Sequence, residues 1–336
     1  MPSARRLLST DPYFALLILL TVFAWAPLTH PDFLQTHAGF LPVFNLYDLE
    51  QRLGDPAWWP LVGRGYDLWR GEGPLPYYLA AAFRWFGFGG IGAVKIVMAL
   101  SIVAGAWGIY GWARPMLGRS GALLASVVYA YWPYTLATMF VRGAWAETVW
   151  MGLLPLALWA SAAARTAGKG HHLILLALAV AALAWTQPGL AAWALATMAA
   201  YLAMEGTRAR GRARVALGGG ILLGAAGLAP QISAQGWGGP APVEFAQHLV
   251  YPFQYFLAGW GTGLSVAGWQ DTLPLSLGLA AVGLALMGSV LGGARGLPSR
   301  LVFAATVTIV CLFLASTLSV PLWRIWPAPA RSLTYP

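Results

Sequence analysis

Charged residues are scarce in this chain of 336 residues. Asp, Glu, Lys and Arg together make up 9% of it, whereas they make up about a quarter of a typical soluble domain. Hydrophobic residues account for 59%. Because so few charges cannot cover the surface of a water-soluble fold, the composition excludes that class and indicates a membrane protein.

Cysteine is almost absent as well. Cys311 is the single cysteine, so no disulfide can form within the chain. The sequence also lacks the residue spacing of a zinc site, a P-loop, a nucleophile elbow or a dinucleotide-binding fingerprint. These absences remove the common soluble enzyme classes. The cofactor stays unknown, because a divalent metal is compatible with the acids discussed below but no ligand spacing indicates one.

Long apolar runs are what the sequence has in abundance. Nine of them lie at residues 13–28, 91–112, 121–137, 148–164, 173–185, 188–204, 215–232, 273–291 and 301–320. Some are shorter than the roughly 20 residues that cross a bilayer, but flanking Trp, Tyr and Gly can extend them into the interface. The pattern predicts an all-α polytopic bundle with about nine spans, formed as a single domain over residues 1–336.

The basic residues fall in alternate loops. With the N-terminus in the cytoplasm, twelve of the 20 basic residues share that side with two acids: Arg5, Arg6, Arg114, Arg119, Arg165, Lys169, Arg208, Arg210, Arg212, Arg214, Arg295 and Arg300, with Asp11 and Glu205. This is the positive-inside pattern. The net charge of +9 therefore reports topology in the cell membrane. Nucleic-acid binding is not expected, and the partners expected first are membrane lipids, because the Arg208–Arg214 loop can contact anionic headgroups.

Two loops on the extracytoplasmic side are long, at about residues 30–90 and 233–272. The first contains a predicted interfacial helix over residues 43–53, with Val43, Leu46, Tyr47 and Leu53 toward one side and Asp48, Gln51 and Arg52 toward the other. It also contains residues 74–86, which are too short to span and therefore lie in the membrane surface or re-enter. The second loop contains another predicted interfacial helix over residues 243–257.

Five ionisable residues near the outer surface are candidates for chemistry, because such groups are costly at a bilayer. Arg142 and Glu147 stand just before an apolar span, and His37, Asp48 and Glu50 in the first loop can meet them. Group transfer from a membrane phosphate requires a carboxylate base and a cation that stabilises the leaving phosphate, which Asp48 or Glu50 with Arg142 would supply. The plainer interpretations are an interfacial ion pair for Arg142 and Glu147, and the wet face of a helix for the acids.

Several short motifs resemble a bacterial membrane family. They are Thr36-His-Ala-Gly, Pro74-Leu-Pro-Tyr-Tyr-Leu, Tyr131-Trp-Pro-Tyr, Val141-Arg-Gly-Ala-Trp-Ala-Glu, Leu154-Pro-Leu and Gly259-Trp-Gly-Thr-Gly. The family is the one labelled 6-pyruvoyl-tetrahydropterin synthase-related, which looks like a branch of the GT-C glycosyltransferases. The resemblance implies no pterin chemistry. It implies a helical bundle whose first outer loop carries catalytic acids and which takes a sugar from a polyprenyl-phosphate donor.

The chain departs from that family's pattern at defined positions. Ala38, Pro42 and Asn45 replace an Asp, a His and an Arg of the first-loop motif, and Thr186-Gln187-Pro188 stands where Thr-His-Asn is usual. His37, Asp48, Glu50, Arg142 and Glu147 are retained. Relatives continue into further spans after the position of Pro336, so the resemblance implies a truncated chain, or one half of a split protein whose partner supplies the missing spans.

Three functions follow from these observations. The first is a membrane glycosyltransferase with Asp48, Glu50 and His37 as catalytic residues, Arg142 at the donor phosphate and Glu147 in support. The second is a catalytically inactive subunit or scaffold descended from the same fold, which the altered first-loop motif favours. The third is a transporter or flippase, which would place ionisable groups at mid-membrane; the charges here gather at the interfaces instead.

Overall fold

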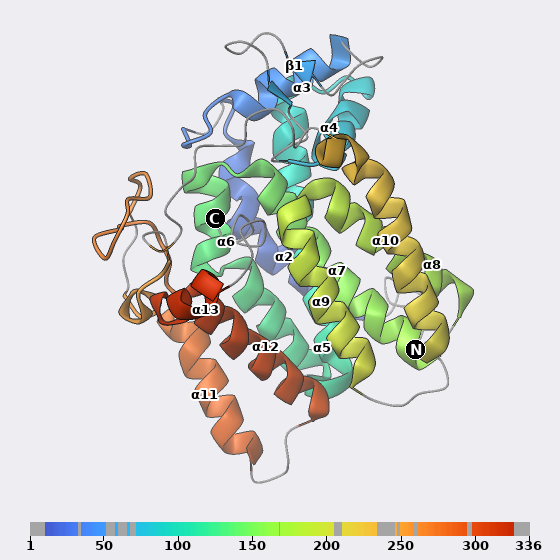
Figure 1. Cartoon of the computed structure of the whole chain (residues 1–336), viewed down its shortest axis with the longest axis vertical. Coiled ribbons are helices and arrows are strands. Elements are labelled where there is room, and N and C mark those ends of the chain that lie inside the picture. The colour runs from blue at the N-terminus through green and yellow to red at the C-terminus, as the bar shows by residue number, and fades with distance from the viewer. Residues whose placement is uncertain are drawn as a thin grey trace. The chain divides into compact units, whose positions relative to one another are not determined.

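The computed structural model describes residues 11–32, 35–51, 58–59, 66–67, 72–167, 169–204, 210–233, 246, 249–257, 261–293 and 298–325. It is built from helices (Figure 1), apart from two paired antiparallel strands of two residues each, β1 (Trp58–Trp59) and β2 (Tyr66–Asp67). The predicted all-α class is therefore confirmed. The chain forms two compact units, residues 1–131 with 138–238, and residues 132–137 with 239–336.

The first unit contains the helices that hold most of the candidate residues. They are α2 (Pro12–Trp25), η1 (Ala26–Thr29), α3 (Leu41–Gln51), α4 (Leu75–Trp85), α5 (Gly90–Ala130), the π-helical turn η3 (Thr138–Arg142), α7 (Trp145–Ala167), α8 (Gly170–Thr186), α9 (Pro188–Ala203) and α10 (Arg210–Ser233).

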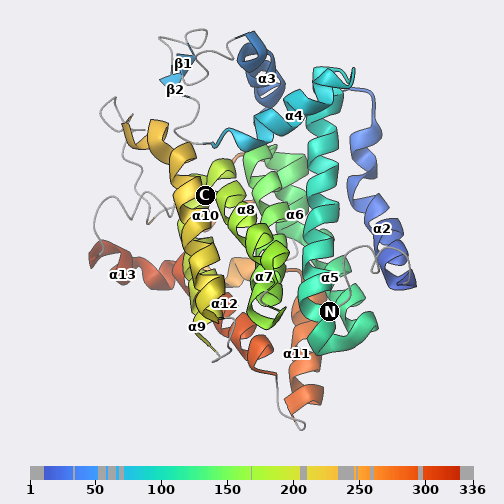
Figure 2. The ribbon, with the colours of Figure 1, turned by 90° about the vertical axis from the view of Figure 1, so that its right-hand side faces the viewer.

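Helix α5 is two helices joined at a reversal. Gly118 has φ 68° and ψ −173°, a backbone conformation that is essentially restricted to glycine. The first half of α5 is antiparallel to α2 (Figure 2). The hydroxyl of Tyr110 donates to Asp11 at the start of α2, whereas Lys95, near the start of α5, donates to the carbonyl of His30, beyond the end of α2. After Gly118 the chain turns back, and Tyr131 donates to the carbonyl of Leu20. The predicted run at residues 91–112 and most of the run at residues 121–137 thus lie in one bent element.

Glycines allow the central helices to approach closely. An added Cβ at Gly108 would lie 2.5 Å from the backbone of Leu156, and one at Gly152 would lie 2.5 Å from the carbonyl of Ser101. The first half of α5 and α7 therefore pack backbone to backbone, as small residues permit in membrane helices. Gly220 is packed against α8 in the same way. The core that results lies between α7, α8, α9 and α10 and is made of Ala, Leu, Val and Met side chains.

Two basic residues that the sequence pattern places in loops contact other parts of this unit. Arg114 forms an ion pair of 3.2 Å with Asp11, the N-cap residue of α2. Arg165 lies in the last turn of α7 and is 1% exposed, with its guanidinium carbon 4.7 Å from the ring centroid of Tyr201. The prediction that Arg165 is a loop residue is wrong, because α7 extends to Ala167 and its neighbours cover the side chain.

Outward-facing positions on these helices are apolar. Leu19 and Phe23 on α2, and Val215 and Leu222 on α10, are largely exposed, which suits a hydrocarbon solvent better than water. Among the described residues, two helical stretches are long and apolar enough to cross a membrane, Pro12–Thr29 and Gly90–Arg142, and four apolar helices are shorter. All nine predicted runs overlap helices, but by this measure the nine-span topology is not established.

Helices α3 and α4 lie across one end of the first unit (Figure 2). The predicted helix over residues 43–53 corresponds to α3, but its faces differ from the prediction. Asp48 is 4% exposed whereas Tyr47 is 43% exposed. The assignment of Asp48 to the wet side is wrong, because α4 and α5 pack against the face that Asp48 shares with Leu49. The guanidinium of Arg84 covers the Tyr47 ring, 4.6 Å from its centroid.

The second unit contains α6 (Pro133–Ala137), η6 (Pro252–Tyr255), α11 (Leu279–Gly293), α12 (Ser299–Ala315), η7 (Thr317–Ser319) and α13 (Val320–Ile325). The helix predicted over residues 243–257 is not found in its described part. Val250 pairs instead with Ser316 in an isolated bridge, and Pro252 begins a single 3-10 turn. Extended pairing takes the backbone N–H of Val250, which donates to Ala315, so a helix cannot use it. Residues 241–245, 247 and 248 lie outside the described residues.

Candidate functional site

The start of the first loop is attached to the segment that carries Arg142. The backbone N–H of His37 donates to the carbonyl of Val141 at 2.9 Å, and that of Ala38 donates to the carbonyl of Arg142 at 3.0 Å. Gly143 makes this approach possible, because a Cβ there would lie 2.1 Å from the hydroxyl oxygen of Thr36. Two motifs that are about 100 residues apart in the sequence are thus joined by their backbones.

Arg142 and Glu147 form an ion pair with an N–O distance of 2.9 Å, and their side chains are 17% and 11% exposed. On a continuous helix, residues five apart do not stack well. Here η3 ends at Arg142, Gly143 has φ 65°, and α7 begins at Trp145. The helix break lets the arginine reach a carboxylate in the first turn of α7. The interpretation of this motif as an ion pair is confirmed.

The inward face of α3 presents polar groups as well as leucines. Asn45 and Asp48 are both buried, and they are separated by one helical turn. Residues three apart on a helix lie on the same face, with about 5–6 Å between their Cβ atoms. Asp48 therefore belongs to the interior of this end of the unit, next to Asn45.

A chain of hydrogen bonds leads from Asn45 to a carboxylate that the sequence reasoning did not select. The side-chain amide of Asn45 donates to the hydroxyl of Tyr77 at 3.1 Å, and this hydroxyl donates to Glu72 at 2.7 Å. Burial raises the pKa of the Glu72 carboxyl, and the hydrogen bond from Tyr77 partly offsets this because it favours the ionised form. In the sequence, one feature indicates that Glu72 belongs to this site, namely its position just before the Pro74-Leu-Pro-Tyr-Tyr motif.

Tyr77 connects this chain to the Arg142 segment. Its ring meets the ring of Trp145 edge to face, with centroids 4.6 Å apart, and both residues are 1% exposed. Beside Glu72, the backbone N–H of Gly73 donates to the carbonyl of Thr186 at the end of α8. A polar cluster therefore lies at one end of the first unit. This name is used hereafter for Thr36, His37, Asn45, Asp48, Glu72, Tyr77, Arg142, Trp145 and Glu147.

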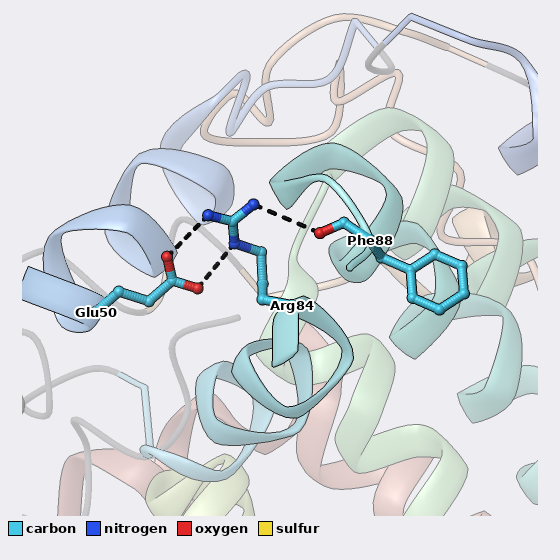
Figure 3. A network of polar contacts seen from close by, with 3 residues as sticks. All are labelled: Glu50, Arg84 and Phe88. Carbon is cyan, nitrogen blue, oxygen red and sulfur yellow. Dashed lines mark hydrogen bonds and ion pairs between the residues drawn. The ribbon is translucent and has the colours of Figure 1, made fainter. Parts of the chain in front are cut away.

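Glu50 is part of a separate pair on the edge of this end. Its two carboxylate oxygens accept from Nε and from a terminal nitrogen of Arg84 at 2.8 and 3.1 Å, and Arg84 also donates to the carbonyl of Phe88 (Figure 3). The two side chains are about a quarter exposed, at 24% and 26%. This arrangement ties α3 to the end of α4, a function that sequence reasoning did not assign to Arg84.

The polar cluster has the groups needed to bind an anion and move a proton. It combines one guanidinium, three buried or partly buried carboxyl groups and a tyrosine hydroxyl. Within the described part of the chain, no group of three or more His, Cys, Asp and Glu side chains is arranged to hold a metal ion. The hydroxyl oxygen of Thr36 and the indole nitrogen of Trp145 are buried and have no hydrogen-bond partner among the described residues, so an acceptor atom could be added there.

Helices with apolar outward faces and a polar cluster at one end define the class of helical membrane proteins. The sequence model of the 6-pyruvoyl-tetrahydropterin synthase related domain, described as a membrane protein, matches residues 72–333. This match covers more than half of the chain, which therefore belongs to that family. No curated protein and no solved structure matches the chain.

Proposed function

We propose that this protein is a membrane glycosyltransferase of the GT-C type, which moves a sugar from a polyprenyl-phosphate donor to an acceptor hydroxyl on the extracytoplasmic face of the cell membrane. The observation that carries the proposal is the attachment of Thr36–Ala38 to the Arg142 segment. It ties the segment that precedes the acidic helix α3 to the segment that carries Arg142. Nine spans with a cytoplasmic N-terminus are part of the same proposal.

Arg142 is the group that we assign to the donor phosphate. A guanidinium has five N–H donors and matches phosphate oxygens in geometry. The ion pair with Glu147 holds the side chain in one place, so little rotamer entropy is lost when a phosphate binds. His37 is exposed on the attached segment and is assigned to the same phosphate or to the acceptor.

Asp48 is the carboxylate that we assign to the acceptor hydroxyl. It is buried on the face of α3 that points into the unit, and an acid has no need to be there if it only solvates a helix. Glu50 is an equal candidate on sequence grounds. Its side chain is 24% exposed and its pair with Arg84 ties α3 to α4, whereas Asp48 is buried, so we favour Asp48 for this role.

A specific observation also favours the alternative, a catalytically inactive subunit. Ala38 occupies the place of the family's acid, directly after His37, and its N–H is used to attach the loop to Arg142. The segment can therefore serve a structural purpose without chemistry. Such a subunit would still bind the lipid phosphate but would not transfer the sugar.

The test is sugar transfer from polyprenyl-phosphate donors by the purified full-length chain in lipid vesicles. Asp48→Asn removes the proton acceptor and should lower the rate of transfer about 10²- to 10⁴-fold. Arg142→Lys weakens the contact with the donor phosphate and should also lower this rate. Asp11→Asn is the matched control, because Asp11 is also a buried carboxylate beside an arginine. It lies at the start of α2, whereas the first loop follows the other end of that helix. Donor binding without transfer in the wild type would select the inactive subunit.

A further inference from the structure

The carboxyl group of Glu72 occupies an unusual position for a residue of a surface loop. It lies directly before α4, it is partly buried, and it accepts the hydroxyl of Tyr77 at 2.7 Å. Tyr77 is itself fixed by Asn45 and by the ring of Trp145. A carboxyl group held this firmly has a defined orientation, which is what proton transfer in a transition state requires.

Two acids of the polar cluster thus stand in different surroundings. Asp48 lies on α3, one turn from Asn45, and Glu72 lies at the other end of the hydrogen-bond chain that begins at Asn45. In many enzymes, two carboxyl groups with different environments divide the work, one ionised and accepting a proton, the other protonated and donating one. Burial keeps the proton on Glu72 to higher pH than usual, since it raises the pKa of this group.

We propose that Glu72 is the proton donor of the outer site, held by Tyr77 and Asn45, and that it protonates the phosphate that leaves when the sugar is transferred. This role rests on the proposed function. The bond between the sugar C1 and the phosphate oxygen breaks, and its electron pair stays on that oxygen. A bond forms between C1 and the acceptor oxygen.

The protons of this step balance between the two acids. The acceptor hydroxyl gives its proton to Asp48, and Glu72 gives its proton to the phosphate oxygen. Arg142 compensates the remaining negative charge of the phosphate. Between turnovers, exchange with water removes the proton from Asp48 and returns one to Glu72, so no oxidant, reductant or further reactant is required.

The elements around Glu72 carry other ionisable groups, so the assignment needs variants that separate them. They are Asp48 and Glu50 on α3, Tyr77 and Arg84 on α4, His37 on the attached loop, and Arg142 and Glu147 at the start of α7. The end of α8 contributes Thr186 through its carbonyl and adds no titratable group there.

The test compares the pH profile of sugar transfer for the wild type, Glu72→Gln, Tyr77→Phe and Tyr78→Phe, using the full-length chain in vesicles. In the wild type, the rate should fall as the pH rises through the pKa of Glu72. Glu72→Gln should lower the rate about 10²- to 10⁴-fold and remove this alkaline limb. Tyr77→Phe should move the limb to higher pH, because it removes a hydrogen bond that favours the ionised carboxylate. Tyr78 is the adjacent, 44% exposed tyrosine, and its variant should keep the wild-type profile.

Retention of polyprenyl phosphate binding by Glu72→Gln, measured as protection against thermal unfolding, separates a chemical role from a structural one. If the wild type transfers sugar and Glu72→Gln has the same rate and pH profile, the role of Glu72 is overturned and the proposed function stays intact. A Glu72→Gln protein that no longer binds polyprenyl phosphate also overturns it, since the residue then only supports the fold. A wild type that transfers no sugar overturns the function, and the role with it.

Discussion

Arg142 and Glu147 are held 2.9 Å apart across a break between two helical segments. The π-helical turn η3 ends at the arginine and α7 carries the glutamate in its first turn. The same break exposes the carbonyls of Val141 and Arg142, which accept the backbone of His37 and Ala38. One local feature therefore creates both the ion pair and the attachment of the first loop.

The Arg142–Glu147 pair should contribute to stability because both side chains are largely buried. Arg142→Gln and Glu147→Gln should each lower the free energy of unfolding by roughly 1.5–3 kcal/mol, as expected for hydrogen bonds between charged groups. The double variant should lose less than the sum of the two. Reversible denaturation in micelles and a double-mutant cycle measure this. Additive losses would mean that the two charges do not interact.

Gly143→Ala should release the first loop. The backbone at Gly143 has φ 65°, and an added Cβ would lie 2.1 Å from the hydroxyl oxygen and 2.7 Å from the Cβ of Thr36. Amide hydrogen exchange at His37 and Ala38 should then become faster. Gly118→Ala is the matched control, since Gly118 also has positive φ but nothing lies within 4 Å of its added Cβ. It should destabilise the chain by about 1–3 kcal/mol through strain and leave exchange at His37 and Ala38 unchanged.

A second change makes the Gly143 prediction more specific. Thr36→Gly removes the atoms that the new Cβ would meet, so adding it to Gly143→Ala should restore slow exchange at Ala38. If exchange stays fast in the combined variant, backbone strain at residue 143 is responsible and the contact with Thr36 is not.

The Glu50–Arg84 pair should be weaker than Arg142–Glu147, because its side chains are about a quarter exposed. The coupling energy from a double-mutant cycle with Glu50→Gln and Arg84→Gln should be about 1 kcal/mol or less, and it should decrease with added salt. Glu50→Gln should lower sugar transfer by less than about tenfold, whereas the loss of a general base lowers it about 10²- to 10⁴-fold. An equal loss in Glu50→Gln and Asp48→Asn would restore Glu50 as a candidate base.

The proposed topology predicts which side of the membrane each loop faces. In a Cys311→Ala background, Gln35→Cys should react with a membrane-impermeant maleimide in intact cells. Ser120→Cys, placed just after the reversal at Gly118, should react only after the membrane is opened. Both positions are exposed. Labelling of Ser120→Cys in intact cells would contradict a cytoplasmic N-terminus.

The positions of the helices were predictable from the sequence because a long apolar run is a local property. The runs at residues 13–28 and 188–204 correspond to α2 with η1 and to α9, within a few residues. The reversal near residue 118 was also indicated, since Arg114 and Arg119 mark a loop between two runs. Prediction failed over residues 249–257, where pairing of Val250 with Ser316 decides the backbone and no local pattern shows it.

The face of α3 could not be predicted in the same way. Polarity alone places Tyr47 inside and Asp48 outside, and the structure has the opposite arrangement. Which face is covered depends on how α4 and α5 return to α3, and these contacts join residues that are far apart in the chain. The role of Arg84 as the partner of both Glu50 and Tyr47 was missed for the same reason.

By itself, the sequence determined that the chain is a helical membrane protein and where its helices lie, because 59% hydrophobic residues and long uncharged runs leave few other structures. It also identified Arg142, Glu147 and the first-loop acids as candidates. Only the tertiary structure decided which polar groups share one site. It joined Glu72 to Tyr77 and Asn45, buried Asp48 and paired Glu50 with Arg84, since hydrogen bonds between distant residues depend on the path of the whole chain.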